Sequence, residues 1–140
     1  MDAKSISLLE FPLVRERLAG ATGFPPGRRL AEALVPVADP ILVEIGLEET
    51  SQVRALLAEH PSAGIGGAHD IDPSVVRAAR GGRLDAAQFA AIAQTIEAAA
   101  RLRDVLAGDR RPLLNDLSRS LHPLPALRST LERSFDPVGE

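Results

Sequence analysis

Apolar residues recur at helical spacing between residues 85 and 108, and this stretch predicts one long amphipathic helix. Asp85 suits the N-cap position, and Gln88 stands three residues later, where a capping box places Glu or Gln. Gly108 follows the last apolar residue and can adopt the left-handed conformation that ends a helix. We expect this helix to be central to the fold. Its apolar stripe consists of Phe89, Ile92, Ala93, Ile96, Ala99 and Leu106, with Phe89, Ile92 and Ile96 expected among the most buried.

The rest of the pattern predicts about six more helices, separated by turns rich in proline and glycine, and no segment alternates as a strand does. The first three are a bent element around Pro12 that ends at Ala19, a short helix Arg28–Leu34 after a turn at residues 22–27, and a helix from Asp39 to about Glu59. The next helix is capped by Asp72 and ended by Gly81-Gly82. After the long helix come one from 109–112 to Leu121 and a last one with Leu127, Leu131 and Phe135. The fold class is therefore all-α, a compact multi-helix domain.

Two of these helices carry further expectations about packing. The inward side chains should be Leu30, Ala31 and Leu34 in the short helix, and Leu42, Ile45, Val53, Leu56 and Leu57 in the helix that follows. Gly46 lies inside the longer helix, where glycine costs about 1 kcal/mol relative to alanine. It either admits a neighbouring helix closely or marks a break.

Composition narrows the function classes. The chain has 140 residues, a net charge of −3, no Cys, Trp or Tyr, and four Phe. A base-stacking platform needs aromatic rings, and a nucleic-acid-binding domain is normally basic, so both are disfavoured. The absence of cysteine excludes disulfides and thiol nucleophiles and fits a cytoplasmic protein. No apolar run approaches the ~20 residues of a membrane helix, so no membrane partner is expected.

Few residues suggest chemistry. The loop Gly64-Ile65-Gly66-Gly67 is rich in glycine, but the Lys and Ser or Thr of a phosphate loop do not follow it. His69, Asp70 and Asp72 resemble metal ligands, but neighbouring residues in a short turn cannot all converge on one ion, so capping and turn hydrogen bonds are the favoured explanation. We therefore assign no catalytic, cofactor-binding or metal-binding residue.

Four arginines form the most concentrated basic patch: Arg101, Arg103, Arg110 and Arg111. One interpretation is compensation of the helix dipole together with solubility. The other is a weak contact with a phosphate backbone or with an acidic partner surface. Asp104 and Asp109 lie among the arginines, so we expect only weak binding of DNA by these residues alone.

Several short motifs, in order along the chain, resemble the N-terminal segment of the bacterial type-2 MutS-like family, the MutS paralogues that lack the mismatch-reading domain. The motifs are Leu9-Glu10-Phe11, Leu34-Val35-Pro36, Glu49-Thr50, Gly67-Ala68-His69-Asp70-Ile71, Arg77-Ala78-Ala79, Gly81-Gly82-Arg83-Leu84 with Phe89, and Asp136-Pro137-Val138-Gly139-Glu140. Pro12 and Asp85 depart from the family pattern. The resemblance covers the whole chain.

The resemblance implies a role within a longer protein. It implies that residues 1–140 form one helical core and lever domain, the first half of that region. Family members continue into a coiled-coil clamp, an ATPase that dimerises and uses ATP and Mg²⁺, and a C-terminal nuclease domain. The implied partners are those domains of the same chain, a second subunit, and branched DNA or collided ribosomes. The implied roles are suppression of DNA recombination and ribosome quality control.

Two hypotheses remain. The chain is either a structural module that transmits ATPase-driven movement to a clamp, or a free-standing helical adaptor that binds a protein partner through an exposed groove. The motif at residues 136–140 favours the first, because the family's next helix would begin there. The sequence does not distinguish DNA from the ribosome as the main target.

Overall fold

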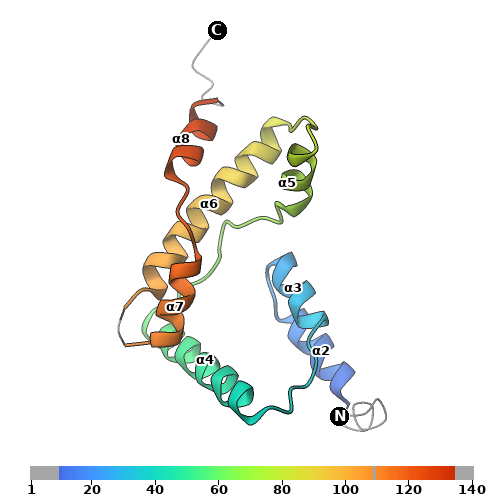
Figure 1. Ribbon diagram of the computed structural model, residues 1–140, viewed down its shortest axis with the longest axis vertical. Coiled ribbons are helices and arrows are strands. Elements are labelled where there is room, and N and C mark those ends of the chain that lie inside the picture. Colours follow the sequence, from blue (N-terminus) through green and yellow to red (C-terminus); the bar gives the residue numbers. More distant parts are fainter. Residues whose placement is uncertain (1–9, 109, 135–140) are drawn as a thin grey trace. The chain divides into compact units, whose positions relative to one another are not determined.

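The computed structural model describes residues 10–108 and 110–134, apart from the side chains of Glu132 and Ser134. This part of the chain contains seven helices and no strand, which confirms the predicted all-α class. The helices are α2 (Phe11–Gly20), α3 (Pro25–Glu32), α4 (Pro40–Glu59), α5 (Asp72–Ala79), α6 (Ala86–Leu106), α7 (Pro112–Ser120) and α8 (Pro125–Ser134) (Figure 1). The predicted helical segment before Pro12, Phe135 and the motif at 136–140 lie outside the described residues.

The chain divides into two compact units, Met1–Thr50 and Ser51–Glu140. In the first unit α2 packs against α3, and Arg15 Nη1 donates to the carbonyl of Glu32 at 3.4 Å. In the second unit α6 packs against both α7 and α8, which lie along it in Figure 1. The predicted long helix is therefore the element around which the second unit is built. The single core and lever domain over residues 1–140 stays a prediction.

Proline opens most of these helices. Pro12, Pro26 and Pro73 are the second residues of their helices. The first residues of four helices are Pro25, Pro40, Pro112 and Pro125. A proline costs little there, because the first-turn N–H groups have no partner inside the helix. This corrects two predicted starts. The helix expected at Arg28 begins at Pro25, inside the predicted turn, and α2 includes Phe11.

The predicted start of the long helix is confirmed in detail. The Asp85 carboxylate accepts from the Gln88 backbone N–H at 2.8 Å, and the Gln88 side-chain oxygen accepts from the Asp85 N–H at 3.0 Å. Both halves of the capping box are thus present. At the other end the helix stops at Leu106, and Gly108 has a φ of 138°, which suits glycine.

The predicted cap of α5 is wrong by one residue. Ile71 occupies the N-cap position, and Asp72 lies in the first turn, where its charge complements the helix dipole. The predicted glycine break is confirmed. Gly81 has a φ of 76°, and the N–H of Gly82 donates to the carbonyl of Arg77 at 2.9 Å, as in a Schellman motif.

The main apolar cluster joins α4, α6 and α7. Its buried members are Leu56, Leu106 and Leu114, with Ala63, Leu102 and Leu121 partly buried against them. The prediction that Phe89, Ile92 and Ile96 are among the most buried residues of α6 is wrong, since all three are half-buried and Ala98 and Leu106 are the buried ones. Burial follows the position of the neighbouring helices, which apolar spacing along one helix does not reveal.

The predicted inward faces of α3 and α4 also need correction. Ala31 and Leu56 are buried as expected, and Gln52 is buried as well. The exposed residues among those predicted inside are Leu30, Leu34, Leu42, Ile45, Val53 and Leu57. Gly46 causes no break in α4, and no atom lies within 4 Å of the position that a Cβ would occupy there. Close approach of a neighbouring helix at Gly46 is therefore absent among the described residues.

Candidate binding groove

An open groove with a volume of about 660 Å³ lies in the second unit. It is bounded by the end of α4, the loop at 60–64, the last turns of α6 and the residues just before α7. Its charged and titratable residues are Glu59, His60, Arg101, Asp104, Arg110 and Arg111. The volume lies within the range of clefts that hold ligands or short peptide segments.

An ion pair fixes one wall of this groove. Arg111 Nη2 lies 2.5 Å from Glu59 Oε2, and the Arg111 side chain is only 16% exposed. The hydrogen bond from Arg111 and its positive charge lower the pKa of the Glu59 carboxyl, and the charges of Arg110 and His60 lower it further. The positive potential at this wall therefore has contributions from several groups of the groove.

A second arginine of the groove is held on α6. Arg101 Nη1 pairs with Glu97 at 3.0 Å one turn earlier in α6, and Arg101 Nη2 donates to the carbonyl of Gly66 at 2.9 Å. Gly67, with a φ of 85°, brings the loop against this guanidinium. The guanidinium is thus positioned by α6 and the glycine-rich loop together.

The loop that bears these glycines is also tied to α6 through His69. The His69 backbone N–H donates to Thr95 Oγ1 at 2.9 Å, and its Nε2 lies 2.6 Å from Gln94 Oε1. His69 therefore anchors the loop to the helix. Among the described residues, no three His, Asp or Glu side chains lie close enough together to hold a metal ion.

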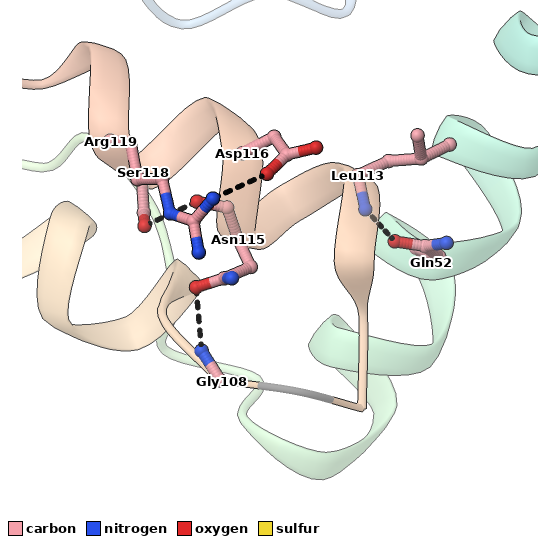
Figure 2. A network of polar contacts seen from close by, with 7 residues as sticks. All are labelled: Gln52, Gly108, Leu113, Asn115, Asp116, Ser118 and Arg119. Atoms are coloured by element: carbon pink, nitrogen blue, oxygen red, sulfur yellow. Dashed lines mark hydrogen bonds and ion pairs between the residues drawn. The ribbon is translucent and has the colours of Figure 1, made fainter.

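The joint between α4 and α7 positions the arginines that precede α7. Gln52 Oε1 accepts from the backbone N–H of Leu113 at 3.1 Å (Figure 2). It also accepts from the N–H of Leu114 at 3.4 Å, and so caps a helix that has no side-chain cap of its own. Asn115 Oδ1 accepts from the N–H of Gly108 at 3.2 Å, as Figure 2 also shows. Both ends of the segment that carries Arg110 and Arg111 are therefore fixed by side chains.

The structure separates the four arginines predicted as one patch. Arg101, Arg110 and Arg111 line the groove, whereas Arg103 lines a different depression with residues of α7 and of the turn after it. Arg101 and Arg103 are two residues apart on a helix, so their side chains point in very different directions. Contact of the four with phosphate or a partner stays a prediction.

Sequence reasoning missed two residues that shape the groove. Glu59 had no marker in the sequence, because its partner Arg111 is distant in the chain. Gln52 was hidden among the exposed residues of an apolar helix, although a buried glutamine is uncommon and implies a satisfied amide. Only the three-dimensional arrangement reveals either role.

Comparison with known proteins gives a consistent result. The chain is 34% identical, over its whole length, to Endonuclease MutS2 of Symbiobacterium thermophilum, and 37% identical to Endonuclease MutS2 of Thermomicrobium roseum. The match to Endonuclease MutS2 of Clostridioides difficile is 34% over 87% of the chain. The chain spans 18% of the length of the first two relatives and 16% of the third. No protein-family model matches the chain.

These observations define the chain first as all-helical and similar to proteins of the MutS-like class. More specifically it is a MutS2-like sequence, since MutS2 proteins match it along its whole length, and the resemblance seen in its motifs is confirmed. In the part of the chain that the structure describes, no helix is both long enough and apolar enough to cross a membrane.

Proposed function

We propose that this chain is the helical core and lever module of a longer MutS-like ATPase, coupling ATP-driven rearrangement of a dimer to a clamp on branched DNA or collided ribosomes. The observation that carries the proposal is the match of the whole chain to less than a fifth of the length of MutS2 proteins. ATP and Mg²⁺ would bind elsewhere in the longer protein. The endonuclease activity that the relatives' names state would also reside outside this chain. Such a protein would act in the cytoplasm.

The construction of the second unit supports this role. A segment that transmits movement has to resist local deformation, and packed helices with fixed polar joints do so. Here α6 is held near its middle by the His69 contacts and at its end by the cluster around Leu106. Gln52 adds a joint between α4 and α7. Because these contacts connect α4, α6 and α7, we expect the three helices to move as one unit.

The test is a chimaera of the Thermomicrobium roseum protein in which this chain replaces the matching segment. The chimaera should hydrolyse ATP and should respond to branched DNA or to collided ribosomes with a changed rate. Deletion of the segment should leave basal hydrolysis but remove the response. A chimaera with Gln52→Ala and Leu114→Ala should show a weakened response, because its α4–α7 joint is loosened.

The same assay indicates the main target of the longer protein, because the change in the rate of ATP hydrolysis can be compared between branched DNA and collided ribosomes. A deletion variant that responds to both substrates as well as the chimaera does would refute the coupling role. Capture of a defined protein partner by the isolated chain, combined with that result, would favour the free-standing adaptor.

A further inference from the structure

We propose that the groove lined by Arg101, Arg110 and Arg111 docks an acidic peptide segment, with Arg110 as its principal contact. This site goes beyond the coupling function and does not depend on it, because all the groove residues named lie in this chain. The occupant is inferred from charge complementarity and from the chemistry of the groove lining.

Arg110 differs from the two arginines beside it. It is exposed and forms no ion pair with any residue in the described ranges, whereas Arg101 pairs with Glu97 and Arg111 pairs with Glu59. Among its described neighbours, the Gly108 N–H donates to Asn115 Oδ1 and the Arg111 side chain pairs with Glu59. A carboxylate at Arg110 would therefore gain a charge-assisted hydrogen bond without breaking an ion pair within the described residues.

The balance of charge in the groove favours an anion. Three guanidinium groups line it, against the carboxylates of Glu59 and Asp104. Arg111 already engages Glu59, which shows that this wall accepts a carboxylate. The lowered pKa of Glu59, caused by Arg111 first and then also by Arg110 and His60, is in keeping with a positive potential here.

A peptide suits this lining better than a nucleic acid does. Ala63, Val105 and Ala107 give the groove apolar patches that can contact peptide side chains. No Phe, Tyr or Trp is among the described lining residues, so the groove lacks the large rings on which bases usually stack. A peptide can place one carboxylate at Arg110 and keep its other charges away from Glu59 and Asp104, whereas a continuous phosphate backbone carries a charge at every nucleotide.

The experiment titrates the 140-residue chain against a fluorescein-labelled peptide of alternating Glu and Leu, followed by fluorescence anisotropy. The same peptide with Gln in place of Glu and a labelled duplex DNA serve as the other probes. Arg110→Ala is the test variant. Arg119→Ala is the matched control, because Arg119 is an exposed arginine of the same unit that does not line the groove and pairs only locally, with Asp116.

The chain should bind the Glu peptide more tightly than the Gln peptide and the DNA. Arg110→Ala should weaken binding of the Glu peptide about tenfold, which corresponds to one charge-assisted contact. Arg119→Ala should leave binding unchanged. Equal affinity for the Glu and Gln peptides, equal losses in the two variants, or no binding of the Glu peptide would each overturn the proposal. Tighter binding of DNA that Arg110→Ala abolishes would assign the groove to nucleic acid instead.

Discussion

The substitution Gln52→Ala tests the joint between α4 and α7 most directly. Gln52 is 7% exposed and Leu114 is 2% exposed, so the hydrogen bonds that the glutamine oxygen accepts are shielded from water. Alanine would leave the two N–H groups at the start of α7 without an acceptor. α7 has no side-chain cap of its own to replace it.

The expected cost follows from this geometry. A buried donor left without a partner costs about 1–3 kcal/mol, and loss of a helix cap costs about 1 kcal/mol. The bond to Leu114 is long at 3.4 Å and therefore weak, so the two bonds do not contribute equally. We expect Gln52→Ala to lower the free energy of unfolding by about 2 kcal/mol.

Urea denaturation followed by circular dichroism measures this change, with hydrogen exchange of the Leu113 and Leu114 amides as a local readout. Exchange at these two amides should accelerate more than at the amides of α6. Arg54→Ala is the control, since Arg54 is an exposed residue of the same helix, and it should change stability by less than about 0.5 kcal/mol. A Gln52→Ala variant as stable as the control, with unchanged exchange, would refute the capping role.

Three further predictions concern packing, pH and backbone entropy. Leu114→Ala should lower the free energy of unfolding by about 2–5 kcal/mol, and Ile96→Ala by roughly half as much, because Leu114 is buried and Ile96 is half-buried. The lowered pKa of Glu59 means that its ion pair with Arg111 contributes stability above the unfolded pKa and loses that contribution as pH falls through the folded pKa. The free energy of unfolding, measured as the pH is lowered, should therefore fall further for the unmodified chain than for Glu59→Gln, which has no carboxylate to protonate at this position. Gly46→Ala should raise the melting temperature, with a gain of about 0.5–1 kcal/mol, since the added methyl group meets no other atom within 4 Å.

Each of these has an outcome that would contradict it. Equal losses for Leu114→Ala and Ile96→Ala would mean that the two sites are equally buried. Identical acid titrations for the unmodified chain and Glu59→Gln would show that the ion pair contributes nothing. For glycine the control is Gly82→Ala, which should destabilise, because its Cβ would lie 2.6 Å from Arg77 Cγ and 3.0 Å from the Arg77 carbonyl oxygen. Similar effects at Gly46 and Gly82 would contradict the packing argument.

Local sequence determined the helices of this protein, because their signals are carried by neighbouring residues. The capping box of Asp85 and Gln88, the break at Gly81-Gly82 and the proline-led starts each depend on side chains within a few positions of the helix end. The family resemblance was likewise readable from short motifs in order along the chain. Apolar spacing predicted that α6 is amphipathic and central to the fold. In the second unit α6 does pack against both α7 and α8.

Tertiary structure alone decided which face of each helix is buried and which charges meet. Gln52 and Leu113 are 61 positions apart, and Arg111 meets Glu59 across the same joint. No local rule pairs residues over such separations, because the pairing depends on how the helices pack. The basic patch shows this most clearly, since four arginines close together in sequence become three on the groove and Arg103 away from it. Helical geometry turns nearby positions outward in different directions, and packing then determines which of them share a surface.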